Sequence, residues 1–191
     1  MPEGTEKERI EHKLSRFDDP NGLHFGTTRY TSFAFMLDAQ AARIDSSMLF
    51  FQEWQGYPHG PPVALKLTKG DAPPFAVRLA VRNMDTGPDS ATPDLVVWTG
   101  SLAPGEWHRF VVMVKPSHGA PIGEVKLWMD GVRVADWTGK IGYDPVAIGG
   151  ALDGFDTKLG LYQPSPNVGH TVYFDDVRFA STFAAANPAG R

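Results

Sequence analysis

Short apolar runs separated by glycine and proline fill most of the chain, and no run keeps a helical period over several turns. Apolar and polar positions alternate within many of these runs, which is typical of strands with one buried face. Strands are therefore expected at 28–37, 47–55, 63–68, 75–82, 95–99, 107–115, 124–129, 132–137, 157–163 and 171–179. About ten strands at this spacing predict an all-β chain, folded as a two-sheet antiparallel β-sandwich of the jelly-roll type.

The strongest local signal is the dipeptide Asp130-Gly131 between two alternating runs. Asp-Gly supplies the positive φ that a type I′ hairpin turn requires. The charged segment 3–17 fits either a frayed helix or an edge strand. Residues 1–180 are expected to form one domain, and 181–191 have the composition of a frayed tail.

Composition narrows the possible functions. The 191 residues carry a net charge of −4 and no cysteine, so disulfides and thiolate metal sites are excluded. The charge gives no sign of nucleic-acid affinity. No apolar run approaches the roughly 20 residues of a membrane helix, and the charged start of the chain shows no signal peptide.

The run 157–163 combines a core face with a polar face. Leu159 and Leu161 point one way along an extended strand, whereas Lys158, Gly160 and Tyr162 point the other. The polar row is about 13 Å long. A central glycine suggests that something approaches the backbone closely. A floor for an extended ligand fits this pattern, and so does a strand with one chance glycine.

Basic residues stand opposite the apolar stripe on several other strands. If these strands lie in one sheet, its outer face is cationic and selects a polyanion by its local field. The alternative is an ordinary solvated face. Trp128, which follows Lys126 at a spacing of two, either stacks on a sugar ring or packs. The basic residues concerned are Lys66, Arg78, Arg82, Lys126 and Lys158.

In the run 47–55, strict alternation places Met48, Phe50, Gln52 and Trp54 on one face and Leu49, Phe51, Glu53 and Gln55 on the other. Glu53 and Gln55 could thus mark the place where a buried strand reaches a cleft, or could simply emerge at a strand end. The six histidines show no HxH or HxxxH pairing, so a zinc site is not expected. Asp175-Asp176 could help to bind a structural calcium ion or could end a sheet in solvent.

Four segments together resemble the jelly-roll polysaccharide lyases with a concanavalin A-like sandwich, especially the glucuronan-lyase and heparinase-I-like groups. Arg9-Ile10-Glu11 is similar to an Arg-x-Glu strand of the family. The family's Gln-Trp-His-Gly segment, which a proline-rich loop follows, is similar to Phe51 to Gly56 and the following Pro61-Pro62. The runs 107–115 and 124–131 are similar to its paired strands that end in Trp-x-(Asn/Asp)-Gly. Lys158 to Tyr162 resembles its Lys-x-Gly-x-Tyr strand.

The resemblance implies β-elimination of a uronic-acid polysaccharide in a concave groove. A cation or hydrogen-bond donor must neutralise the sugar carboxylate, a base must take the C5 proton, and an acid must protonate the leaving oxygen. A tyrosine can perform either transfer where nearby cations lower the pKa of its phenol from about 10. The resemblance assigns proton transfer to Tyr162 and makes Arg9 and Lys158 groove cations. Together with the basic strand faces and the polar residues near Trp54, it gives the expected catalytic residues Arg9, Gln55, His59 and Tyr162. The expected substrate-binding residues are Glu53, Lys66, Arg78, Arg82, Lys126, Trp128, Lys158 and Gln163.

One departure from the family matters. Glu53 stands where the family usually has glutamine, and Gln55 where it usually has histidine. Three outcomes follow: Tyr162 performs both transfers, with Gln55 or a protonated Glu53 on the carboxylate; His59 supplies the imidazole; or the site is inactive and the domain binds glycans. A lyase for glucuronan-, alginate- or heparin-like chains is the leading hypothesis, and a non-catalytic carbohydrate-binding module is the alternative. The expected protein is a secreted monomer that needs no cofactor, binds an anionic polysaccharide, and binds neither nucleic acid nor membrane.

Overall fold

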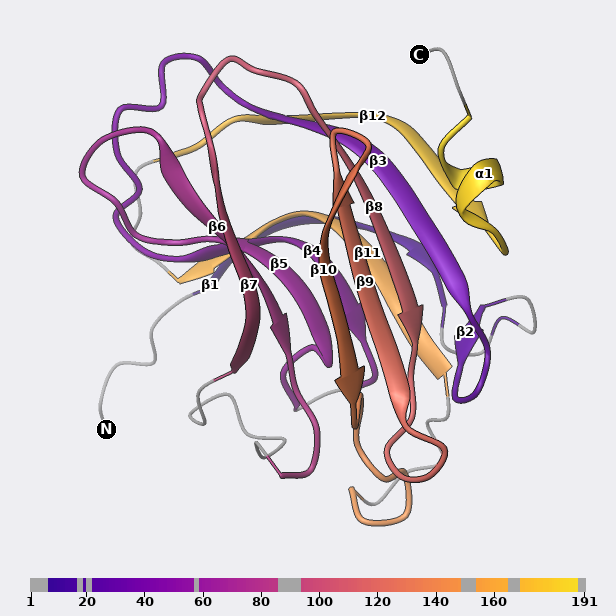
Figure 1. Cartoon of the computed structure of the whole chain (residues 1–191). Helices are drawn as coiled ribbons and strands as arrows, with labels where there is room; N and C mark the ends of the chain where they lie inside the picture. Colours follow the sequence, from indigo (N-terminus) through magenta and orange to yellow (C-terminus); the bar gives the residue numbers. More distant parts are fainter. Residues whose placement is uncertain are drawn as a thin grey trace, which may run out of the picture.

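A computed structural model describes residues 7–16, 19, 22–56, 59–85, 94–148, 154–164 and 169–188, without the side chains of 7–9 and 164. Two antiparallel sheets lie over one another as layers (Figure 1). The seven-stranded sheet has the order β1 (Lys7–Ser15), β11 (Gly154–Pro164), β4 (Met48–Trp54), β5 (Val63–Leu67), β6 (Phe75–Val81) and β7 (Leu95–Leu102), with β2 (Leu23–His24) paired to β11. The five-stranded sheet has the order β10 (Val132–Gly139), β9 (Gly123–Met129), β8 (His108–Lys115), β3 (Arg29–Leu37) and β12 (Val172–Ala180).

The predicted β-sandwich is confirmed, and each expected strand is present within a few residues of its predicted ends. For the segment 3–17 the sequence allowed either a frayed helix or an edge strand, and the structure shows the edge strand β1 there. The short strand β2 was not predicted, since two residues carry no periodicity. The hairpin between β9 and β10 turns at Asp130 (φ 52°) and Gly131 (φ 80°), the positive φ values that the Asp-Gly signal predicted.

Aromatic side chains fill the space between the sheets. Phe35 of β3 stacks on Phe50 of β4 with ring centroids 4.3 Å apart, and Phe33 stacks on Phe51 at 5.6 Å. All four rings are buried. Each buried phenylalanine ring removes a large apolar area from water, so the four rings stabilise the fold. Their contacts also join β3 of one sheet to β4 of the other.

A β-bulge in β4 changes which side chains face the core. Opposite β5, Leu49 pairs with Lys66 but Phe51 already pairs with Leu65, so one extra residue, Phe50, is inserted. Two successive phenylalanines therefore point inward, and the alternation is reversed beyond them. The predicted faces of 47–55 were wrong for this reason: Glu53 points inward, whereas Gln52 and Trp54 lie on the outer face with Leu49.

The C-terminal segment is more ordered than its composition suggested. Thr182 caps a short helix, α1 (Phe183–Ala186), which lies beside β12 and β3 (Figure 1). Phe183 packs on Trp128 with ring centroids 4.6 Å apart, and the carbonyl of the buried Ala186 accepts a hydrogen bond from Ser32. These contacts hold 182–186 against the five-stranded sheet, so the expectation of a frayed tail was wrong for this part.

Candidate active site

The outer face of the seven-stranded sheet, called here the tyrosine face, carries a row of cations beside Tyr162. The register makes Arg9 of β1 and Leu49 of β4 the neighbours of Tyr162 on either side. Leu49 in turn pairs with Lys66 of β5, and Lys66 with Arg78 of β6. Directly paired residues point to the same side of a sheet, and neighbouring strands lie about 4.8 Å apart. The phenol is thus in one row with the side chains of Leu49, Lys66 and Arg78, two of which are cations, and Arg9 is its backbone partner on β1.

A second row crosses the same face. Lys13, Lys158 and Gln52 are paired neighbours on β1, β11 and β4. The ammonium of Lys158 lies over the ring of Trp54, 3.7 Å from its centroid, and Gln52 Nε2 donates to Glu11 Oε1. The predicted common face of Lys158 and Tyr162 is therefore observed, with Leu159 and Leu161 buried on the reverse.

Gly160 is explained by the sheet itself. A Cβ at this position would lie 2.1 Å from the carbonyl oxygen of Ile10 and 2.6 Å from Cα of Glu11, both in the backbone of β1. The residue also has φ 134° and sits in a bulge between Leu159 and Tyr162. The close approach that the glycine indicated is made by a neighbouring strand, so the prediction of a ligand at Gly160 is not needed to explain it.

The predicted cations differ in how far they are neutralised. Lys66 and Arg82 both form ion pairs with Asp94, and Arg82 is buried. Arg78 is exposed, and no ion pair is found for it within the described part of the chain. Of these groups, Arg78 has the most charge available for an anion on the tyrosine face.

Lys126 and Trp128 do not belong to this face. Both are on β9 in the five-stranded sheet, so the condition that all basic strands share one sheet is not met. Lys126 pairs with Glu124 at 3.1 Å, and Trp128 is covered by α1. The expectation that they share one face with Lys66 and Arg78 was wrong, because strand order cannot be read from strand-by-strand alternation; their role in substrate binding stays a prediction.

Glu53 is an interior residue. It is 1% exposed, and its Oε2 accepts hydrogen bonds from Arg29 Nη2 (2.9 Å) and Thr157 Oγ1 (2.8 Å). Burial raises the pKa of Glu53 to about 7, and the charge of Arg29 opposes this effect only in part. Its predicted contact with substrate is contradicted, since the β4 bulge turns the side chain away from the outer face.

Gln55 is likewise an interior residue with a structural role. It is fully buried, its Nε2 donates to the carbonyl of Tyr143 (2.8 Å), and its Oε1 accepts from the Tyr143 N–H (2.7 Å). The Tyr143 hydroxyl donates to the carbonyl of Gly60 at 2.8 Å, and burial raises its pKa. The prediction that Gln55 meets the substrate carboxylate is contradicted, because both its polar atoms hold a backbone segment.

His59 and Gln163 lie outside the row that contains Tyr162. The carbonyl of His59 accepts a hydrogen bond from the indole of Trp54 (2.9 Å), and its ring lies 5.5 Å from that of Tyr143. Gln163 is 5% exposed and follows Tyr162 with the opposite orientation on β11. His59 is thus near the Trp54 end of the tyrosine face, whereas Gln163 faces inward and does not fit its predicted contact with substrate.

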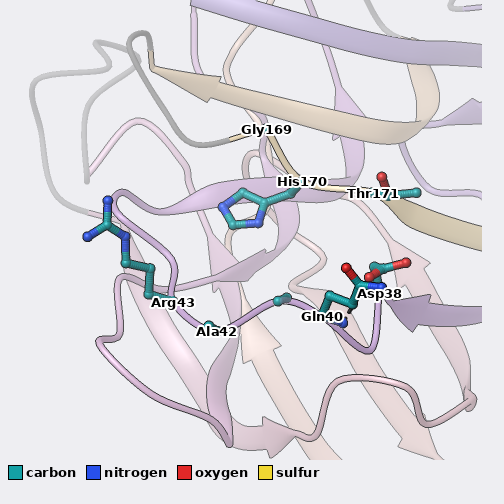
Figure 2. A pocket seen from close by; sticks show the side chains of 8 residues that line it. Asp38, Gln40, Ala42, Arg43, Gly169, His170 and Thr171 are labelled. Carbon is teal, nitrogen blue, oxygen red and sulfur yellow. Dashed lines mark hydrogen bonds between the residues drawn. The ribbon is translucent and has the colours of Figure 1, made fainter.

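A cavity of about 600 Å³, separate from the tyrosine face, lies between the loop after β3 and the segment before β12 (Figure 2). It is lined by Asp38, Arg43 and His170, among others. Arg43 pairs with Asp45 at 3.1 Å, and burial lowers the pKa of His170, so its imidazole is disfavoured as a cation. The cavity is a weaker anion site than the tyrosine face for this reason.

Metal ligation and membrane insertion find no support in the described residues. They contain no group of three or more His, Asp or Glu side chains suited to a metal ion. Asp176, proposed for calcium, lies between the guanidinium groups of Arg109 and Arg178. Among the helices described, none is long and apolar enough to cross a membrane.

Sequence reasoning missed several residues that shape the site. Gln52 shares the tyrosine face, but strict alternation grouped it with core residues. Arg29 and Tyr143 are buried partners from distant parts of the chain, and Asp94 neutralises two of the predicted cations. The one available signal was the double phenylalanine at 50–51, which indicates a bulge in a strand that is otherwise alternating.

The fold defines a class, the two-sheet antiparallel β-sandwiches. A family model described as polysaccharide lyase matches residues 2–178, nearly the whole chain. The chain belongs to this family, and it is an enzyme of the polysaccharide lyase class.

Solved structures of lyases share the architecture. Endo-β-1,4-glucuronan lyase from the fungus Trichoderma reesei superposes with a TM-score of 0.72 at 20% identity, over 100% of this chain and 82% of that one. An alginate lyase from Pseudomonas aeruginosa gives 0.52 at 17%, over 84% and 68%. Alginate lyase A1-II′ in complex with product gives 0.61 at 11%, over 95% and 75%. At these identities the likeness shows the fold, and no curated protein sequence matches the chain.

Proposed function

We propose that the protein cleaves a uronic-acid polysaccharide by β-elimination on the tyrosine face. The observation that carries the proposal is the row in which Tyr162, Leu49, Lys66 and Arg78 are paired across four neighbouring strands, with Arg9 as the backbone partner of Tyr162 on β1. At about 4.8 Å per strand, Lys66 and Arg78 lie roughly 10 and 14 Å from Tyr162. The face therefore offers a proton-transfer group and cations along the path of an anionic chain.

The reaction is balanced within the substrate. Removal of the C5 proton leaves a carbanion whose charge is delocalised into the C6 carboxyl group and is stabilised by the neighbouring cations. The electron pair of the C5–H bond becomes the C4=C5 double bond as the C4–O bond breaks, and the departing oxygen receives a proton. The proton count is unchanged, so one group that first accepts and then donates a proton is sufficient.

Tyr162 fits both proton transfers. His59 contacts Trp54, the last residue of β4, whereas Tyr162 pairs with Leu49 near the start of that strand. At about 3.3 Å per residue, Leu49 and Trp54 are roughly 15 Å apart. Gln55 cannot serve, since its amide is fixed to Tyr143. Removal and return of the proton by one phenol implies that the C5 hydrogen and the leaving oxygen are on the same face of the sugar.

The remaining groups of the tyrosine face bind the polymer. Arg78 and Lys158 supply positive charge from different rows, and Gln52 supplies an amide beside Lys158. Glucuronan and alginate are the first substrates to test, because the family is one of polysaccharide lyases and similar solved structures are glucuronan and alginate lyases. A polymeric substrate also implies that the protein acts outside the cell, and one complete face per chain is consistent with a monomer.

Ultraviolet absorbance tests the proposal, because only elimination creates the conjugated double bond. The wild-type protein is incubated with glucuronan, alginate and heparin, and absorbance should rise on one of them. Tyr162→Phe should lose at least about a hundredfold in kcat, as expected for general acid–base catalysis, and should keep its thermal midpoint and its affinity for the polymer. Binding without absorbance gain on all three polymers would instead favour a carbohydrate-binding module.

A further inference from the structure

A cavity of about 420 Å³ opens on the outer face of the five-stranded sheet, on the opposite layer from the tyrosine face. Its floor is Ala34 of β3, which is paired with Arg109 of β8 on one side and Asp175 of β12 on the other. A small side chain between two long ones leaves a depression in the surface of a sheet. Trp107, next to the start of β8, forms part of its wall.

Two polar atoms at this cavity lack a hydrogen-bond partner. His108 Nδ1 lies 2.8 Å from Asp130 Oδ2, and because a carboxylate only accepts, Nδ1 carries the hydrogen. Nε2 of the same ring is covered by protein and has no partner among the described residues, and Glu106 Oε2 lies 3.9 Å from it. Arg109 binds Asp176 through Nη2, while its Nη1 is buried and has no partner among the described residues.

Both atoms are covered by protein, so a ligand in the cavity does not reach them. The polar groups that are open to the cavity are the carboxylates of Asp130 and Asp175, which are exposed and accept hydrogen bonds. Such acceptors match a ligand with several hydroxyl groups, each of which can donate.

The indole of Trp107 supplies an apolar surface beside these polar atoms. It is 49% exposed, unlike the other large side chains of the cavity wall. An exposed aromatic ring next to a few fixed polar groups is a common composition of binding sites for small amphipathic molecules. A pyranose ring has this dual character, with C–H groups on its faces and hydroxyl groups around its edge.

Charge distinguishes this cavity from the tyrosine face. Arg109 and Arg178 are both paired with Asp176, and His108 contacts Asp130, but the lining itself holds three carboxylates (Asp130, Asp175 and Asp176) against one guanidinium. A uronate would be repelled here, whereas an uncharged sugar would not. A metal ion is also disfavoured, because the guanidinium groups already occupy Asp176.

We propose that the cavity formed by Ala34, Trp107, His108, Arg109, Asp130 and Asp175 is a second carbohydrate site, which binds a neutral sugar segment on the face opposite the catalytic one. Such a site would hold the enzyme on a matrix in which polyuronate is mixed with neutral polysaccharide. It makes no contact with the reacting sugar, so it affects affinity for the matrix and not the chemical step.

Isothermal titration of the full-length protein with cellohexaose, xylohexaose and mannohexaose tests the proposal. One of these neutral hexasaccharides should bind, and Trp107→Ala should weaken that binding at least about tenfold, equivalent to about 1.4 kcal/mol. Tyr162→Phe is the matched control and should bind the same sugar as wild type does. Soluble polyuronate turnover should be unchanged in Trp107→Ala, with a thermal midpoint close to that of wild type.

His108→Phe provides a second variant that keeps an aromatic ring and removes the nitrogen that holds Asp130, and it should also lose the neutral sugar. Failure of all three neutral hexasaccharides to bind overturns the site, as does undiminished binding by Trp107→Ala. A loss of polyuronate affinity in Trp107→Ala, with neutral sugars bound normally, would assign the cavity to the acidic polymer and refute the proposal. Loss of turnover in Tyr162→Phe is independent of all these outcomes, so the catalytic proposal is tested separately.

Discussion

Arg29 Nη2 lies 2.9 Å from Glu53 Oε2, and this contact joins the two sheets beneath the tyrosine face. Arg29 belongs to β3 of one sheet and Glu53 to β4 of the other. Ser15 of β1 and Thr157 of β11 also bond to the guanidinium. A single buried cation thus fixes three adjacent strands of the sheet that carries the candidate site.

The two partners of this ion pair should differ in what their loss costs. Glu53→Leu leaves a buried guanidinium that cannot lose its proton, and should lower the free energy of unfolding by about 3–5 kcal/mol. Arg29→Met leaves a carboxyl group that can protonate, so its cost should be smaller. Urea unfolding of both variants measures the difference. Glu53→Gln is the control and should cost least, because its amide oxygen can still accept from Thr157; a larger loss in Arg29→Met than in Glu53→Leu would contradict this account.

The raised pKa of Glu53 predicts a pH dependence of stability. Its pKa in the folded protein is about 7, against an ordinary value of 4.5 for a glutamate side chain. Between these values the unfolded chain has lost the proton that the folded chain retains, so stability falls as pH rises through this window. Urea unfolding of wild type and Glu53→Gln from pH 4.5 to 7 isolates the effect: wild type should lose stability relative to the variant. A relative gain would show that attraction to Arg29 outweighs burial.

Gly160 should be irreplaceable for steric reasons. In Gly160→Ala the added Cβ would collide with the backbone of β1 at Ile10 and Glu11, at a φ that L-residues rarely adopt. We expect a loss of at least about 2 kcal/mol, since backbone atoms cannot move aside as a flexible side chain can. Gly119→Ala, where nothing lies within 4 Å, is the control and should change the thermal midpoint little. A neutral Gly160→Ala would mean that β1 is displaced easily.

The sequence was sufficient for the sandwich, the Asp130-Gly131 turn and the common face of Lys158 and Tyr162, because each depends on local periodicity. It was insufficient where one residue shifts the register. The extra residue Phe50 reverses the orientation of everything after it in β4, so strict alternation grouped Gln52 with Met48 and Phe50, and Glu53 with Leu49. No local pattern reports which strands pair, and so Lys126 was grouped with Lys66 and Arg78 although it lies on the other sheet.

Arg78 and Lys126 are a matched pair for testing which sheet binds the polymer. Both are strand cations, but only Arg78 shares a row with Tyr162. Arg78→Gln should raise KM for the polyuronate severalfold with little change in kcat, and the effect should weaken with added salt. Lys126→Gln should leave both constants unchanged. Steady-state kinetics at two ionic strengths measures this, and an equal effect of both variants would exclude the tyrosine face as the selective one.

Gln52 and Gln55 are two amides of one segment with opposite expected roles. Gln52 is on the tyrosine face beside Lys158, whereas Gln55 holds both backbone polar groups of Tyr143. Gln55→Leu leaves a buried N–H and a buried carbonyl unsatisfied, so it should lower the free energy of unfolding by about 2 kcal/mol or more. Gln52→Leu should retain most of its stability but lose turnover at least about tenfold, as the substrate carboxylate loses a donor. Thermal unfolding and absorbance kinetics on both variants separate the roles, since the two should fail in different assays. A Gln55→Leu variant that folds normally but is inactive, together with an active Gln52→Leu, would support the sequence-based prediction that Gln55 binds the substrate carboxylate. The interpretation of the β4 bulge would then be wrong.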